Sequence, residues 1–95
     1  MKRLTYTLEA TDEIIYGKNN SNDPIQFDRE VLQALEFLSS GIVSGQTTGI
    51  GGHRQWILPR LPYSVIYHES DDEVRIIAFA HHKRKPGYWK RRLKP

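Results

Sequence analysis

Two apolar segments joined by a short acidic turn constrain the fold of this chain more than any other feature. Residues 63–69 and 73–80 are rich in Val, Ile, Tyr and Phe, a composition typical of β-strands. The Ser-Asp-Asp sequence of residues 70–72 is typical of a turn. The pattern predicts two adjacent antiparallel strands. Because the second is apolar on both faces toward its end, we expect it at the centre of a sheet, covered by helices.

Alternation assigns the strand residues to faces. In the first strand we expect one face to carry Tyr63, Val65 and Tyr67. In the second, strict alternation opposes Arg75, Ile77 and Phe79 to Val74, Ile76, Ala78 and Ala80. Two shorter strands are predicted at residues 2–7, with Leu4 and Tyr6 facing inward, and at residues 53–58, with Trp56 and Leu58 on one face.

Two amphipathic segments predict helices. Residues 8–16 form the first, which Gly17 ends, and its inner face is expected to carry Leu8, Thr11 and Ile15. The second has stronger local signals, because Asp23 can cap it and Pro24 suits its first position. Its buried stripe is expected to contain Phe27, Val31, Ala34, Leu35 and Leu38, and Gly41 ends it.

These elements predict one domain over residues 1–95, a two-layer α+β fold of order β-α-α-β-β-β. An antiparallel sheet packs against a helical hairpin, and residues 81–95 form a basic tail. Residues 41–52 hold five glycines and are expected to be a flexible connector. They do not predict a phosphate-binding loop, since they follow a helix and lack a Gly-Lys-Ser/Thr sequence.

Several kinds of chemistry are not supported by the residues present. The chain has no cysteine, which excludes disulfides, thiolate catalysis and Cys-based zinc sites. His81 and His82 point to opposite faces of an extended strand, and no His, Asp or Glu triplet has metal-ligand spacing. We expect no metal and no cofactor. No apolar run approaches the roughly 18–20 residues that span a bilayer, and no signal peptide is evident, so we expect a cytoplasmic protein without membrane contact.

The charge of the chain is strongly asymmetric. Residues 81–95 contain seven Lys or Arg side chains and no acid, whereas residues 1–80 hold the other seven and all 11 acids. A basic end on an acidic body indicates a nucleic acid or an acidic protein as partner. A solvated terminus is the alternative, and charge by itself does not separate the two.

Basic and aromatic residues gather near the sheet edge and in the tail. Arg and Lys neutralise phosphates, and Tyr, Trp or His stack on unpaired bases or act as acid and base in a metal-free ribonuclease. The candidate target-binding residues are Arg54, Arg60, His81, His82, Lys83, Arg84, Tyr88 and Trp89, beside Lys85. The structural alternative is that Tyr88 and Trp89 fold the tail onto the sheet while Arg54 or Arg60 pairs with helix acids. We expect a chain without residues 81–95 to fold but to lose its function.

The residues from 60 to 89 resemble a known family. They contain Leu-Pro-Tyr-Ser-Val-Ile-Tyr and then Ala-Phe-Ala-His-His-Lys-Arg-Lys-Pro-Gly-Tyr-Trp, and with the preceding strand and two helices they resemble the RelE/ParE superfamily. This superfamily comprises toxins of type II toxin–antitoxin systems, formerly called plasmid stabilisation proteins. The resemblance covers essentially the whole chain. It implies a sheet packed on a helical hairpin and a cognate antitoxin, whose complex with the toxin binds operator DNA through the antitoxin.

The resemblance leaves three functions open. The His81-x-Lys83-Arg84 ending is closer to the ParE-like branch, which implies growth arrest by protein–protein inhibition of DNA gyrase and no enzymatic activity. A RelE-like member would be a metal-independent endoribonuclease that cuts mRNA on the ribosome, with Arg60, His81, Arg84 and Tyr88 near the scissile phosphate. The lysine-rich segment of those nucleases is absent, and the glycine segment stands in its place. A non-toxic relative would bind its antitoxin and act in operon autoregulation.

Overall fold

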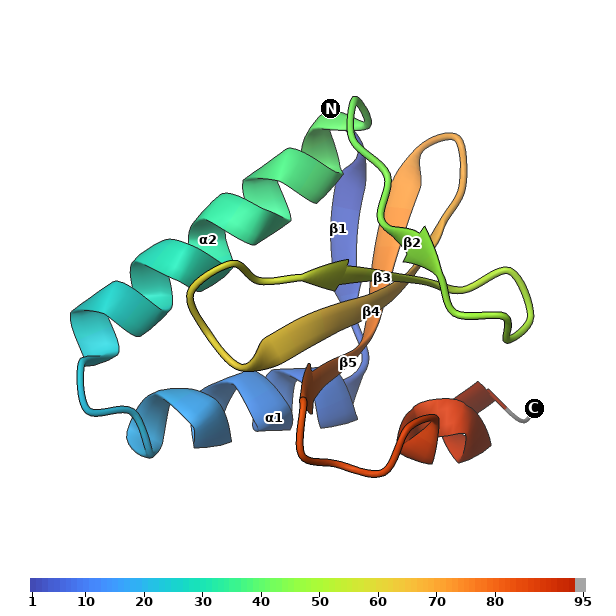
Figure 1. The fold of residues 1–95 in the computed structure, drawn as a ribbon. Helices are drawn as coiled ribbons and strands as arrows, with labels where there is room; N and C mark the ends of the chain where they lie inside the picture. Colours follow the sequence, from blue (N-terminus) through green and yellow to red (C-terminus); the bar gives the residue numbers. More distant parts are fainter. Residues whose placement is uncertain (94–95) are drawn as a thin grey trace.

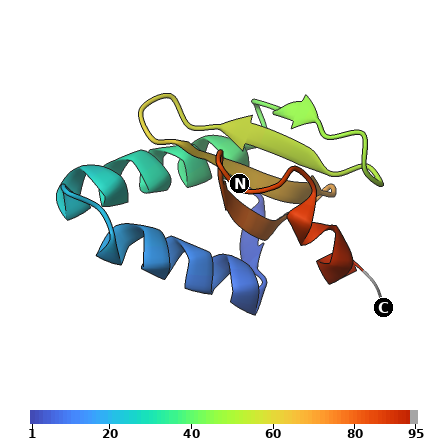
Figure 2. The ribbon, with the colours of Figure 1, turned by 60° about the horizontal axis from the view of Figure 1, so that its bottom comes forward.

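The computed structural model describes residues 1–93, and residues 94–95 of the expected tail lie outside it. The elements are β1 (Arg3–Tyr6), α1 (Leu8–Asn19), α2 (Pro24–Ser40), β2 (Gln46–Thr47), β3 (Arg54–Ile57), β4 (Tyr63–Glu69), β5 (Glu73–His81) and the 3₁₀ helix η1 (Tyr88–Leu93) (Figure 1). The two-layer α+β architecture is confirmed: α1 and α2 lie on one side of a five-stranded sheet (Figure 2).

The sheet has the order β1-β5-β4-β3-β2. Strands β2 to β5 are antiparallel neighbours, whereas β1 is parallel to β5. The expected central position of β5 is confirmed, since β1 and β4 flank it. The glycine segment is not merely a connector, because it contributes β2 and a turn to β3. Gly45 is required where the chain enters β2, since a Cβ there would lie 2.1 Å from the Gln55 carbonyl oxygen.

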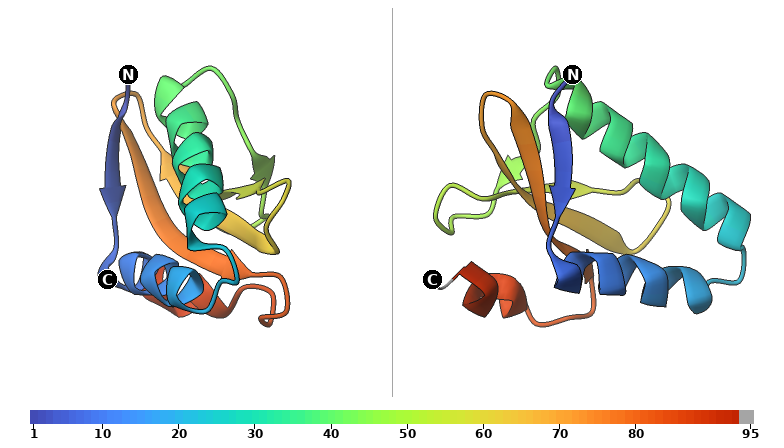
Figure 3. Two further views of the ribbon diagram at one scale, coloured as in Figure 1. Left: turned by 90° about the vertical axis from the view of Figure 1, so that its left-hand side faces the viewer. Right: turned by 180° about the vertical axis from the view of Figure 1, so that it is seen from behind.

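The predicted caps and stripe of α2 are confirmed. Asp23 accepts a hydrogen bond from the Gln26 N–H at 3.1 Å, and Gly41 ends the helix with a φ of 73°. All five stripe residues are buried in the core that α2 shares with β4 and β5. Figure 3 shows α2 running diagonally across the sheet, with α1 below it.

The face predicted for α1 is wrong. Leu8 and Ile15 are 75% and 53% exposed, and Thr11 is exposed as well. The helix instead buries Ala10 and Gly17, with Ile14 packed at the edge of the core. Gly17 does not end the helix. Gly17 lies inside α1, where it packs closely on α2. A Cβ at this position would lie 2.9 Å from the Phe27 ring, so a glycine is needed.

Two strand-face predictions also fail. Tyr6 is 43% exposed rather than inward-facing. The alternation predicted for β5 fails as well. Ile66 and Tyr67 of β4 are adjacent, but they pair with Ala78 and Ile76 of β5, which leaves Ile77 as an extra residue in a β-bulge. The bulge shifts the alternation by one residue. Val74, Ile76 and Phe79 therefore face the helices, while Ile77 and Ala78 face the opposite side.

The tail is folded onto the sheet. Trp89 of η1 is 3% exposed and packs against Ile66, Ile77 and Ala78 on the face away from the helices. The bulge makes this second cluster possible, because it turns two adjacent β5 side chains toward η1. Residues 81–93 are thus part of the packed structure, which argues against the expectation that a chain without residues 81–95 still folds.

Candidate functional site

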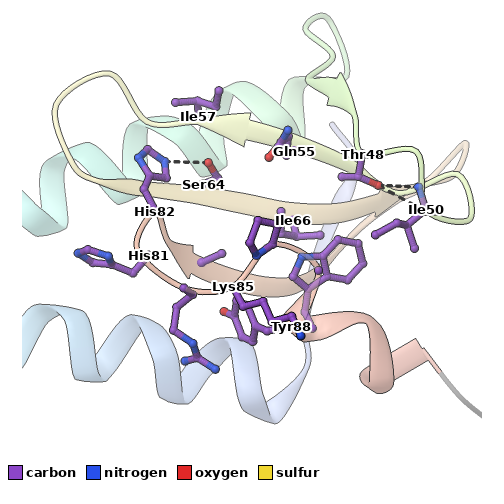
Figure 4. A pocket seen from close by; sticks show the side chains of 15 residues that line it. Thr48, Ile50, Gln55, Ile57, Ser64, Ile66, His81, His82, Lys85 and Tyr88 are labelled. Carbon is purple, nitrogen blue, oxygen red and sulfur yellow. Dashed lines mark hydrogen bonds between the residues drawn. The ribbon is translucent and has the colours of Figure 1, made fainter.

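A groove of about 510 Å³ crosses the sheet on the face away from the helices. Alternation in β3 and β4 builds its floor, because Trp56 and Val65 point to the helices while their neighbours point to the groove. Figure 4 shows the tail passing along one side of this floor. The lining residues, which define the sheet groove, are Thr48, Ile50, Gln55, Ile57, Ser64, Ile66, Ala80, His81, His82, Arg84, Lys85, Pro86, Gly87, Tyr88 and Trp89.

The sheet groove has an apolar floor and one basic rim. Ile57, Ile66 and Ala80 contribute apolar surface, and Ile57 is 48% exposed. The cations come from the tail, as Arg84 and Lys85, and no acidic residue lines the groove. His82 lies over the floor, with its Nε2 3.0 Å from the Ser64 hydroxyl (Figure 4). An apolar floor beside a basic rim suits a protein segment that carries apolar and acidic side chains.

Glu13 of α1 fastens the tail to the body of the protein. Its carboxylate accepts hydrogen bonds from the Tyr88 hydroxyl at 2.5 Å and from Arg92 at 2.9 and 3.0 Å. It also accepts the Phe79 N–H at 3.1 Å, while Arg92 donates to the Ile77 carbonyl at 3.2 Å. One carboxylate therefore connects α1, β5 and η1.

This network satisfies the edge of β5 where β1 no longer covers it. The pairing of β1 with β5 stops at Ile76, and α1 begins directly after its N-cap residue Thr7. Beyond that point, no strand among residues 1–93 pairs with Ile77 and Phe79 on this side of β5. Side chains of Glu13, Arg92 and Thr7 bond them instead. Because unpaired buried backbone groups are costly, these contacts also stabilise the sheet.

The network sets the protonation of its members. Burial by itself would raise the pKa of Glu13, but the hydrogen bonds from Arg92, Tyr88 and the Phe79 N–H, with the charge of Arg92, outweigh it and lower that pKa. Burial, and then the hydrogen bond to Glu13, raises the pKa of Tyr88 well above its usual value. The hydrogen bond to Glu13 raises the pKa of Arg92. Tyr88 is thus held as a neutral phenol and Glu13 as a carboxylate.

The lowered pKa of Glu13 predicts a loss of stability in acid. The contribution of Glu13 is fully present above its ordinary value of 4.5 and is lost as the pH falls through the lower, folded value. We expect the difference in unfolding free energy between the wild type and Glu13→Gln to be largest above about pH 5 and to shrink below about pH 4. Urea unfolding of both proteins across this range measures it, and a difference that does not change with pH would contradict it.

The structure brings some of the predicted site residues together. His81, Arg84 and Tyr88 line the sheet groove, and with Lys83 they also line a second cavity of about 600 Å³ between α1 and the tail. The Arg84 guanidinium lies 3.8 Å from the centre of the Tyr88 ring. His82 lines the sheet groove only. Trp89 lines it from a buried position, in agreement with the structural alternative for this residue.

The two arginines of the strand region lie elsewhere. Arg54 bonds the Gly45 carbonyl at 3.0 Å, and neither Arg54 nor Arg60 lines the sheet groove. A guanidinium nitrogen of Arg60 lies 3.4 Å from a carboxylate oxygen of Glu30 in α2. This agrees with the structural alternative, in which Arg60 pairs with an acid of a helix. The four residues of the nuclease alternative are therefore not gathered at one site.

Other parts of the site gave no sequence signal. Ile57 and Ser64 belong to alternating strands, and only the choice of face makes them groove residues. Glu13 is one of several acids in an acidic helix. Its partners lie 66 to 79 residues away, so no local spacing could identify it.

The part of the chain that the structure describes contains neither a metal-binding cluster nor a membrane-spanning helix. Among residues 1–93, no group of three or more His, Asp or Glu side chains could hold a metal ion. No helix in this range is long and apolar enough to cross a bilayer.

Comparison with known proteins gives a match at the level of structure. No protein-family model and no curated protein matches the chain. A solved structure described as the chromosomal ParDE TA system from P. aeruginosa superposes with a TM-score of 0.70 at 17% sequence identity, over 85% of this chain and 96% of that chain. At this identity the likeness shows the fold alone. The chain has a ParE-like α+β fold.

Proposed function

We propose that this chain, as one domain over residues 1–95, is the toxin of a type II toxin–antitoxin module and acts in the cytoplasm. It arrests growth by inhibiting DNA gyrase through protein–protein binding, and a cognate antitoxin neutralises it. The fold is shared with a structure whose title describes a ParDE TA system. The 60–89 motif supports the same class.

We favour protein binding over RNA cleavage because the candidate acid–base groups are already engaged in contacts within the protein. The Tyr88 hydroxyl donates to Glu13, and the His81 Nδ1 accepts the Lys83 N–H at 3.0 Å. A general base must reach the proton that it removes and must be able to take it. The Tyr88 hydroxyl and the His81 Nδ1 are thus engaged in contacts within the protein, and Arg60 lies apart from them. The sheet groove is thus better suited to binding a protein surface than to cutting RNA.

The exposed apolar face of α1 supports an antitoxin. Leu8, Ile15 and Tyr16 are 75%, 53% and 70% exposed, and residues seven apart lie on the same side of a helix. Clustered exposed apolar side chains mark surfaces that a partner covers. We assign this face to the antitoxin and the sheet groove to gyrase.

A supercoiling assay with purified gyrase tests the proposal. We expect the wild-type protein to inhibit supercoiling and Ile57→Asp to be at least about tenfold weaker, because a charge in the apolar floor is left unpaired on binding. Leu32→Asp is the matched control. This residue is 58% exposed on α2, away from the groove, and we expect it to inhibit as the wild type does.

A parallel translation assay separates the alternatives. Intact mRNA together with inhibited gyrase supports the proposal. Codon-positioned mRNA cleavage with active gyrase would establish the ribosome-dependent nuclease instead. If expression leaves growth unimpaired, the non-toxic relative that acts in operon autoregulation is the correct function.

A further inference from the structure

An open hollow of about 710 Å³ lies on the outer side of the tail, apart from the sheet floor. The chain reverses at Gly87, whose φ of 75° favours glycine. The turn brings Lys85, before Gly87, to the same hollow as Lys90 and Arg91 of η1. The other lining residues are Pro86, Gly87 and Tyr88. We call this surface the tail hollow.

The tail hollow is positively charged without compensation. No acidic residue lines it, and none of the ion pairs found within residues 1–93 includes Lys85, Lys90 or Arg91. Arg92, their neighbour in η1, is by contrast paired with Glu13. The fold thus directs one arginine inward to hold the tail and keeps the adjacent cations exposed. Because like charges repel, such a group is stabilised by an anion with several charges.

The composition of the tail hollow favours a phosphate backbone over a protein as its ligand. Protein interfaces depend on a few large apolar or aromatic anchors in well-packed pockets. Trp89, the large apolar residue of this segment, is 3% exposed and contributes to the core instead. Backbone phosphates need only exposed Lys and Arg side chains, which the hollow supplies and which Lys83 and Arg84 extend.

The same surface lacks a platform for unpaired bases. Sequence-tolerant binding of single strands depends on aromatic rings on which bases stack. Tyr88 is the aromatic residue of the tail hollow. The centre of its ring lies 3.8 Å from the guanidinium carbon of Arg84 and 5.1 Å from the guanidinium carbon of Arg92. Its hydroxyl is bonded to Glu13. The hollow therefore has charge but no free stacking surface, and the denser charge of a duplex suits it better.

We propose that Lys85, Lys90 and Arg91 bind the sugar–phosphate backbone of duplex DNA without reading its sequence. This contact is made by the chain itself and needs no antitoxin. Lys85 also lines the sheet groove, whereas Lys90 and Arg91 line the tail hollow only. The groups act as point charges, so binding is governed by salt.

Fluorescence anisotropy of a labelled duplex of about 20 base pairs, titrated with the purified full-length chain, tests the proposal. We expect log affinity to fall linearly with log salt concentration, with a slope magnitude of about 3 to 5 for the three central and two flanking cations. Lys85→Glu/Lys90→Glu should weaken binding at least about tenfold at low salt and lower the slope by about 2. Arg29→Glu/Arg75→Glu, on exposed positions of α2 and β5, changes the net charge equally and should bind nearly as the wild type does.

Each other outcome overturns the inference. Absence of duplex binding at low salt would do so, as would equal losses in the two double variants, which would show a general charge effect. Clearly tighter binding of a single strand of the same length would refute the duplex as partner. Tighter binding of polyglutamate than of the duplex would assign the hollow to an acidic protein. Circular dichroism of both variants confirms that they are folded.

Discussion

Replacing Trp89 with alanine is expected to lower the free energy of unfolding by about 3–5 kcal/mol, the range for removing a large buried aromatic side chain. Trp89 is 3% exposed and packs on Ile66, Ile77 and Ala78. Its loss leaves a cavity between η1 and the sheet that rigid strands cannot close. A chain of 95 residues has a small stability margin. The melting temperature should therefore fall by at least about 15 °C, measured by circular dichroism.

Two companion variants make this prediction specific. Trp89→Phe keeps part of the buried ring and should lose less than half as much as Trp89→Ala. Tyr16→Ala removes an aromatic ring that is 70% exposed, so its effect should stay within about 0.5 kcal/mol. Equal losses in Trp89→Ala and Tyr16→Ala would show that η1 does not pack on the sheet as described.

The burial of Trp89 changes how truncations of the tail must be interpreted. Removing residues 81–95 takes away the last residue of β5, the Trp89 anchor and two partners of Glu13. Ile66, Ile77 and Ala78 would then face water. A truncated chain without activity would therefore report lost structure and not a lost binding site. Point substitutions of exposed residues such as Ile57 and Lys85 separate function from folding.

The sequence predicted those elements whose signals are local. The limits and buried stripe of α2 were correct because Asp23, Pro24 and Gly41 are terminal signals within one segment. The pairing of β4 with β5 followed from two apolar runs around a short acidic turn. Each of these inferences requires only neighbouring residues, and the structure bears each one out.

The failures arise where distant contacts decide the structure. One extra residue at Ile77 reverses the faces of the second half of β5, and nothing in an apolar run marks a bulge. The exposed Leu8 and Ile15 of α1 have the spacing of a buried face. The residues of α1 that are buried in the core are Ala10 and Gly17. Their small size lets α1 pack closely against its neighbours, such as Phe27 of α2. An exposed apolar face and a buried core face look alike in a single sequence.

Removing the Glu13 side chain is expected to be nearly as damaging as removing Trp89. In Glu13→Ala, Arg92, the Tyr88 hydroxyl and the Phe79 N–H lose their shared acceptor. The Arg92 and Glu13 side chains are 14% and 16% exposed, so water replaces the lost contacts only in part. We expect a loss of about 2–4 kcal/mol, the range for leaving a largely buried charge and polar groups unpaired. Urea unfolding measures it.

Neighbouring and paired substitutions test whether the network itself is responsible. Asp12→Ala removes an exposed carboxylate from the adjacent position of α1 and should change stability by less than about 0.5 kcal/mol. Glu13→Ala combined with Arg92→Met removes both charges, and it should recover part of the loss because no buried charge is left alone. If the double variant is instead less stable by the sum of the two single losses, the two residues act independently. Glu13 would then not be the carboxylate that fastens the tail to α1 and β5.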